Sequence, residues 1–119
     1  MSKDSLSELS ERLKAFAVAR DWEQFQSPKN LAMAISGECG ELVEHFQWLS
    51  EQQSYELSTQ QLREVGFEMA DILIYILRMA ERLNVDLIAS ANEKMDINED
   101  RFPVDKVKGK AARGEQLSS

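Results

Sequence analysis

Apolar residues recur every three or four positions along most of the chain, a spacing typical of amphipathic helices. The pattern predicts an all-α fold with four long helices, at about residues 6–22, 28–50, 60–83 and 87–99. Ser27 followed by Pro28 is a start signal for the second helix, because serine caps helices and proline suits their first turn. Ser58 or Thr59 and Asp86 are candidate caps for the third and fourth helices.

The segments outside these helices carry little pattern. Residues 1–5 are expected to fray, residues 51–58 are predicted to form a loop, and residues 105–119 are predicted to be a disordered tail. The remaining residues, 1–104, are predicted to form one domain, because a chain of this length supports a single core.

Two acidic pairs interrupt the apolar positions of the second and third helices. Glu38 and Glu41 form one pair, and Glu68 and Asp71 form the other. Residues three apart lie on one helix face, about 60° from each other around the axis. On a helical wheel Glu38 falls inside the apolar stripe of its helix, and the third helix is apolar almost all round where Glu68 and Asp71 occur.

Two interpretations account for these carboxylates. In the first, each pair is the solvated border of an amphipathic helix, the usual place for acidic residues. In the second, the two helices face each other and the four carboxylates hold a hard divalent cation such as Mg²⁺, which prefers oxygen ligands. Two pairs in the two most apolar helices favour the metal site, because anions buried without compensation cost several kcal/mol.

Aromatic and polar residues beside these helices are candidates for binding a ligand. Trp22 in the connector, Trp48 and Tyr75 offer flat faces on which a base can stack, although packing in the core or at an interface explains each equally well. His45 is read first as a packed or interfacial residue and second as a phosphate contact. Lys94 and Asn98 lie on the fourth helix, where a lysine serves either the helix dipole or a triphosphate.

Composition narrows the classes of function. The chain has 119 residues and a net charge of −7, which argues against binding a nucleic-acid polymer but leaves a free nucleotide open. Its single Cys39 excludes an intrachain disulfide and suits a reducing cytoplasm. No apolar run approaches the length of a membrane span and no charged-then-apolar leader is present, so neither a membrane protein nor a secreted one is expected.

Several motifs in this order resemble the MazG-like all-α nucleoside triphosphate pyrophosphohydrolases, and most closely their dCTP pyrophosphatase branch. They cover roughly residues 6–104 and comprise Arg20-Asp21-Trp22-Glu23-Gln24-Phe25, Pro28-Lys29-Asn30-Leu31-Ala32, Gly37-Glu38-x-Gly40-Glu41-Leu42, Phe46-Gln47-Trp48, Glu68-x-x-Asp71-Ile72-Leu73-Ile74-Tyr75 and Lys94-Met95-Asp96-Ile97-Asn98. The resemblance implies a four-helix bundle whose helices pair within a homodimer or homotetramer, with the ligand pocket between subunits.

The resemblance also implies an activity: Mg²⁺-dependent hydrolysis of a (deoxy)nucleoside triphosphate, such as dCTP, to the monophosphate and pyrophosphate. By this resemblance Glu38, Glu41, Glu68 and Asp71 are the metal ligands. The residues implied to bind the nucleotide are Trp22, Glu23, Gln24, Phe25, Gln26, Trp48, Tyr75, Lys94 and Asn98. The general base that activates water is one of Glu38, Glu41 and Glu44.

The chain departs from the branch at two positions on the nucleoside side, where the animal dCTP enzymes have His and this chain has Leu13 and Gln26. The departure concerns the preferred base and not the metal site. Two other functions fit the sequence. One is a helical interaction module, such as an adaptor without catalysis, and the other is a dUTPase-like enzyme or a phosphoribosyl-ATP pyrophosphohydrolase of the same all-α group.

Overall fold

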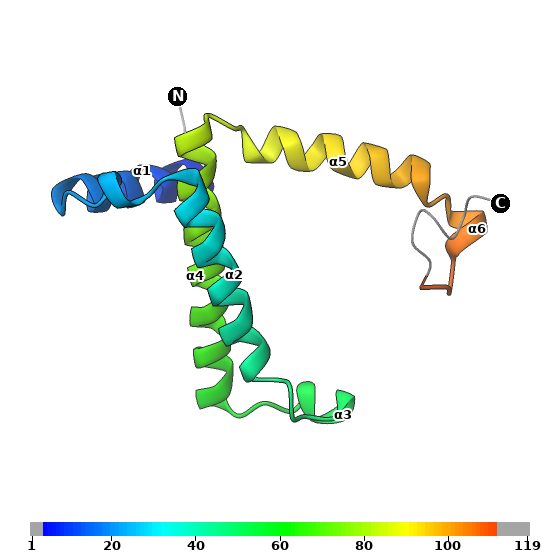
Figure 1. Ribbon diagram of the computed structural model, residues 1–119. Coiled ribbons are helices and arrows are strands. Elements are labelled where there is room, and N and C mark those ends of the chain that lie inside the picture. The colour runs from blue at the N-terminus through cyan, green and yellow to red at the C-terminus, as the bar shows by residue number, and fades with distance from the viewer. Residues whose placement is uncertain (1–3, 112–119) are drawn as a thin grey trace. The chain divides into compact units, whose positions relative to one another are not determined.

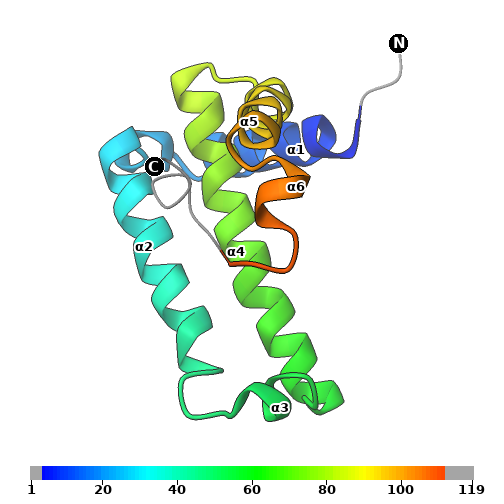
Figure 2. The same ribbon diagram turned by 90° about the vertical axis from the view of Figure 1, so that its right-hand side faces the viewer.

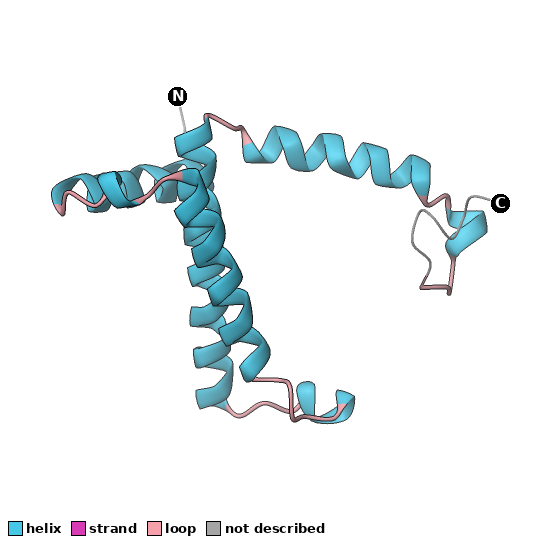
Figure 3. Cartoon of the chain, in the orientation of Figure 1, coloured by secondary structure: helices cyan, strands magenta, loops and turns pink. Residues whose placement is uncertain are grey.

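The computed structural model describes residues 4–111, which form helices and loops and no strand (Figures 1 and 3). The prediction of an all-α fold is therefore confirmed. In chain order the elements are α1 (Ser5–Ala19), the 3₁₀ helix η1 (Glu23–Phe25), α2 (Pro28–Glu44), α3 (Glu51–Ser54), α4 (Thr59–Leu83), α5 (Leu87–Arg101) and α6 (Val104–Val107).

The described residues divide into two compact units, one that ends at Asn84 and one that begins at Val85. In the first unit α2 and α4 run side by side in opposite directions, and α1 packs across the C-terminal half of α4 (Figures 1 and 2). The second unit consists of α5 and the short α6. The carboxylate pairs and the aromatic connector both belong to the first unit.

The predicted helix starts are confirmed by their capping hydrogen bonds. The Oγ atom of Ser27 accepts from the backbone N–H of Asn30 at 3.1 Å at the start of α2. Ser58, rather than Thr59, caps α4 and forms a reciprocal capping box with Gln61. Asp86 caps α5 through the N–H of Ala89. Each serine or aspartate thus satisfies a backbone donor that has no partner inside the helix.

The predicted end of the second helix at residue 50 is wrong, because α2 ends at Glu44. The next residues continue as tighter turns, in which the N–H of Phe46 donates to the carbonyl of Val43 three residues back. Ser50 then begins a new helix through a capping box with Gln53. The prediction of a loop at residues 51–58 is therefore wrong for the four residues of α3.

Three other boundaries also differ from the prediction. The first helix ends at Ala19 rather than near residue 22, because Asp21 adopts a left-handed φ of 55° and the chain turns into η1. Ser5 does not fray, since the helix that Asp4 caps already includes it. The short helix α6 lies at the start of the predicted tail and was not expected, whereas residues 1–3 and 112–119 lie outside the described residues.

The apolar core of the first unit is small. Among the described residues only four apolar side chains are almost fully enclosed: Ala17, Leu31, Val65 and Leu77. Many large apolar side chains on α2 and α4 remain exposed, including Met33, Val43, Phe67, Met69 and Leu73. No helix in residues 4–111 is long and apolar enough to cross a membrane.

Candidate active site

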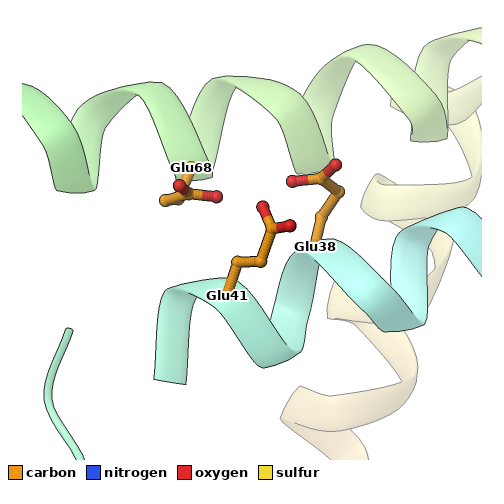
Figure 4. A group of neighbouring side chains, drawn as sticks. All are labelled: Glu38, Glu41 and Glu68. Carbon is orange, nitrogen blue, oxygen red and sulfur yellow. The ribbon is translucent and has the colours of Figure 1, made fainter. Parts of the chain in front are cut away.

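Three carboxylates meet between α2 and α4. Glu38 and Glu41 extend from α2 toward Glu68 on α4 (Figure 4), and one oxygen from each lies within 4.8 Å of the others. The three-residue spacing on α2 places Glu38 and Glu41 on the face that packs against α4. We refer to Glu38, Glu41 and Glu68 as the carboxylate cluster.

The cluster concentrates negative charge in a partly dehydrated place. Burial, together with Glu41, Asp71 and Glu68, raises the pKa of Glu38 to about 7. Burial and the charges of Glu41 and Asp71 also raise the pKa of Glu68, while His45 opposes that rise. His45 Nε2 lies 3.8 Å from Glu68 Oε1, which puts the only histidine of the chain beside the cluster.

Two carboxylate oxygens are buried without a hydrogen bond from any described residue: Glu38 Oε2 and Glu68 Oε2. A buried acceptor without a donor is costly, and most such groups in folded proteins have a partner. Three converging carboxylates, two of which have an unsatisfied oxygen, form the donor set that a hard divalent cation prefers. The residues present therefore fit a metal ion, and Mg²⁺ is the cation that the sequence suggested.

Asp71 lies outside the cluster but close to it. Its charge contributes to the raised pKa of both Glu38 and Glu68, and the same residue lines a neighbouring pocket. The structure thus brings three of the four predicted metal ligands together and places the fourth where the cluster adjoins the pocket. A ligand held in this pocket would have part of its surface near the carboxylates.

The pocket lies between α1, the connector before α2 and the C-terminal half of α4. Its volume is about 400 Å³, within the range of small-molecule sites. Phe16, Trp22 and Tyr75 contribute aromatic surface to its wall, and the rings of Phe16 and Trp22 meet edge to face at 5.5 Å. Its complete lining is Leu9, Arg12, Leu13, Phe16, Ala17, Trp22, Gln26, Asp71, Ile74, Tyr75 and Arg78.

A buried arginine holds the connector against α4. Arg78 is only 2% exposed, and its guanidinium donates to Gln26 Oε1 at 3.0 Å, Glu23 Oε1 at 3.3 Å and Glu81 Oε2 at 3.2 Å. Arg82 donates to the backbone carbonyls of Gln26 and Glu23. Two arginines on one helix therefore fix both the backbone and the side chains of the connector segment.

The predicted nucleotide-binding residues separate into three groups. Trp22, Gln26 and Tyr75 line the pocket. The other connector residues do not line it: Glu23 pairs with Arg78, Gln24 donates to Asp21 and Phe25 is largely exposed. The third group lies elsewhere: Trp48 follows the end of α2 and is 86% exposed, and Lys94 and Asn98 belong to α5 in the second unit.

Most of the pocket wall was not predicted from the sequence. Leu9 and Phe16 on α1 follow a helical spacing, so the pattern alone indicates packing residues, and Leu13 was noted only through the resemblance, as a departure on the nucleoside side. Arg12 carries no signal beyond being a charged helix residue. Arg78 pairs with Glu23 and Glu81, two contacts that no pattern in the sequence indicates. A charged residue close to the apolar centre of α4 was the one signal that could have identified it.

Comparisons with known proteins agree with this fold. A model of the MazG-like family matches residues 33–117. The chain is 42% identical over 100 residues to dCTP pyrophosphatase 1 of Rattus norvegicus, an alignment that covers 82% of this chain and 59% of that protein. It is 39% identical to the Bos taurus protein of the same name over 114 residues, covering 94% and 68% of the two chains.

The Homo sapiens protein of the same name is 43% identical over 90 residues, which cover 74% of this chain and 53% of that one. The chain thus spans little more than half the length of the rat and human relatives. A crystal structure of a pyrophosphatase from Archaeoglobus fulgidus superposes with a TM-score of 0.81 at 36% identity, covering 87% of this chain and 96% of that one. The chain therefore belongs to the MazG-like family.

Proposed function

We propose that this protein hydrolyses (deoxy)nucleoside triphosphates, with dCTP or a related pyrimidine deoxynucleotide as substrate, to the monophosphate and pyrophosphate. The observation that carries the proposal is the contact between two features, a carboxylate cluster suited to a divalent cation and an aromatic-walled pocket, which adjoin at Asp71. The names of the relatives in rat, cow and human supply the substrate class.

The pocket is the place for the nucleoside. Tyr75 and Trp22 offer ring faces for a base, and the pocket volume of about 400 Å³ suits a nucleoside-sized ligand. Asp71 both lines the pocket and lies close enough to the carboxylate cluster to influence it, so a nucleoside in the pocket would have its phosphates on the side of the cluster, where a bound cation would offset the negative charges. This orientation puts the reacting phosphorus beside Glu38 and Glu41 and leaves the base among the aromatic side chains.

In the proposed reaction water attacks the α-phosphorus, the bond to the bridging oxygen of the β-phosphate breaks, and pyrophosphate leaves. Glu38 or Glu41 accepts the proton that the attacking water loses. Glu38, Glu41, Glu68 and Asp71 would hold Mg²⁺, which when bound supplies positive charge to the triphosphate oxygens. The unsatisfied oxygens of Glu38 and Glu68 support this assignment.

We further propose that the protein works as a homodimer or homotetramer. The support is the large exposed apolar surface on α2 and α4, which includes Met33, Val43, Phe67 and Leu73, beside a small enclosed core. In such an assembly Trp48, Lys94 and Asn98 are proposed to reach a nucleotide, the first at its base and the other two at its phosphates. The single, exposed Cys39 supports a reducing, cytoplasmic location.

The test is a panel of dCTP, dUTP, dTTP, dATP, dGTP and CTP, incubated with the purified protein with and without Mg²⁺ and assayed for pyrophosphate. We expect Mg²⁺-dependent pyrophosphate release that is fastest with a pyrimidine deoxynucleotide, and none in the Glu38→Gln variant. Release from dUTP alone or from phosphoribosyl-ATP would instead assign another activity of the all-α group. No release and no metal-dependent nucleotide binding would favour an interaction module.

A further inference from the structure

The side chain of Gln26 is held in one orientation by Arg78. Arg78 Nε lies 3.0 Å from the amide of Gln26, and a guanidinium carries only donors. The end of the amide that faces Arg78 must therefore be the oxygen. An amide that is free to rotate can turn either its oxygen or its amino group toward a ligand, whereas this one keeps its oxygen toward Arg78 and leaves the Nε2 amino group as its other end.

The side chain of Arg78 is itself held in place, so it cannot move if the Gln26 amide rotates. Its other two guanidinium nitrogens donate to Glu23 and Glu81, and Lys14 pairs with Glu81 at 3.1 Å from the far side. The buried guanidinium thus has partners in three directions, and moving it would break charge-assisted hydrogen bonds away from bulk water. The Gln26 backbone is held as well, through the hydrogen bond from Arg82 Nε to its carbonyl.

Both residues line the pocket, so the amide that Arg78 holds is part of the wall around the space where a ligand would bind. Gln26 Nε2 makes no hydrogen bond with the residues that the structure describes, and Gln26 is only partly exposed. A ligand that fills the pocket must supply an acceptor there or leave the amino group without a partner, at a cost that corresponds to about fivefold to a hundredfold in affinity.

We propose that Arg78 is a positioning residue that determines base specificity by keeping the Gln26 oxygen turned toward itself, so that the amino group, a hydrogen-bond donor, is presented to the base. Pyrimidine bases differ in the hydrogen-bonding groups on the edge that would face such a donor. An amino group placed between O2 and N3 of cytosine meets two acceptors, whereas in uracil and thymine it meets the acceptor O2 but faces the N–H at N3. The fixed amide therefore selects cytosine over uracil and thymine. This inference rests on the proposed function, which places a nucleoside in the pocket.

Gln26→Glu is the decisive variant, because it changes the offered group and keeps the shape. The carboxylate still accepts from Arg78 with one oxygen and presents the other oxygen, an acceptor, in place of the amino group. We expect the ratio of kcat/KM for dCTP to that for dUTP to fall at least about tenfold. The added charge acts on both nucleotides alike, so the ratio isolates the effect of the donor.

Gln60→Glu is the matched control, since it makes the same chemical change on the exposed first turn of α4, about 16 Å along the helix from Asp71. Its dCTP-to-dUTP ratio should equal that of the wild type. Arg78→Lys tests the positioning role directly, because lysine keeps the charge but lacks the Nε donor that orients the amide. A freed amide can then rotate, and the ratio of kcat/KM for dCTP to that for dUTP should fall toward one.

A second experiment measures nucleotide binding in the absence of catalysis and of metal. Isothermal titration with dCMP and dUMP in EDTA should show tighter binding of dCMP to the wild type, and a loss of that difference in Gln26→Glu. An unchanged preference in the variant, by kinetics or by binding, would overturn the inference while leaving the proposed function standing, and a wild-type preference for uracil would also overturn it. Absence of pyrophosphate release from every triphosphate would remove the proposed function, and the dCMP and dUMP titrations would still decide the role of Gln26.

Discussion

Glu38→Gln tests the carboxylate cluster most directly, because it removes one negative charge and keeps the shape of the side chain. Burial, and then the neighbouring carboxylates of Glu41, Asp71 and Glu68, raise the pKa of Glu38 from 4.5 to about 7. Without metal, the folded protein therefore binds a proton at Glu38 more tightly than the unfolded chain does.

This difference in proton affinity determines whether the free energy of unfolding rises or falls with pH. The free energy of unfolding of the metal-free wild type should fall as the pH rises from about 4.5 to about 7 and stay low above that range, because the native state must then accommodate the charged carboxylate. The glutamine side chain of the variant does not ionise, so the variant escapes this loss. Glu38 keeps part of its surface in solvent, which limits the gain above neutral pH to roughly 1 kcal/mol, or about 4 °C in Tm.

In Mg²⁺ the wild type should be more stable than Glu38→Gln, the reverse of the order expected in EDTA. The ion binds only ionised carboxylates, so the affinity of the wild type should fall about tenfold for each pH unit below about 7. The variant lacks one ligand and should bind Mg²⁺ at least about tenfold more weakly. The same substitution is thus expected to stabilise the protein in EDTA and to lose the stabilisation that Mg²⁺ gives the wild type.

The assay is thermal unfolding followed by circular dichroism between about pH 5 and pH 8, in EDTA and in Mg²⁺, together with calorimetric titration of Mg²⁺. Glu93→Gln, the same change at an exposed position in α5, should behave like the wild type throughout. Equal Mg²⁺ affinity in Glu38→Gln and wild type would refute the reasoning. So would a wild-type stability in EDTA that rises with pH across this range.

Three further predictions test the rest of the first unit. Asp71→Asn should lower pyrophosphate release from dCTP by at least about a hundredfold with the fold intact by circular dichroism, and near-normal turnover would argue against its place at the site. Trp22→Ala should raise KM for dCTP about fivefold to a hundredfold, since stacking is worth about 1–3 kcal/mol per base, and an unchanged KM in steady-state kinetics would exclude stacking. Leu31→Ala should cost about 2–5 kcal/mol in urea unfolding, whereas a smaller loss would mean that this small core relaxes around the cavity.

The carboxylate cluster could be predicted from sequence because its cause is local. The three-residue spacing of Glu38 and Glu41 fixes them on one helix face, and the surrounding apolar residues show which face packs. Which of the four carboxylates come closest depends on the register of α2 against α4, and no local pattern contains that register. The structure brings Glu68 into the cluster and leaves Asp71 at the edge of the pocket.

Helix ends were predicted less well, because two local signals competed. The apolar spacing of Phe46 and Leu49 continues the pattern of α2, and it predicted a helix as far as residue 50. Ser50 and Gln53 form a capping box, however, which starts α3 and separates it from α2. The Ser-x-x-Gln pattern at residues 50–53 is the local signal that predicts the start of α3.

The pocket depends on residues far apart in the sequence, such as Leu13 on α1 and Tyr75 on α4. Periodicity identifies both as members of apolar helix faces, but it does not distinguish a face that packs tightly from one that leaves a cavity. The resemblance to the family supplied Trp22, Gln26 and Tyr75, and it also supplied Glu23, which the structure uses to hold Arg78.

α4 carries buried or partly buried charges of both signs, and the difference in their partners separates a structural role from a functional one. Arg78 has all of its directions satisfied by residues of its own chain, so its charge serves to fix the connector. Glu68 Oε2 has no donor among the described residues, and Glu38 and Glu41 beside it are also anions, although His45 lies 3.8 Å from its other oxygen. A charge that the fold compensates only in part raises the energy of the free protein, and it persists most readily where a ligand of opposite charge lowers that energy on binding. By this criterion Arg78 has a structural role in the free protein, whereas Glu68 has the partners expected of a residue in the proposed metal site.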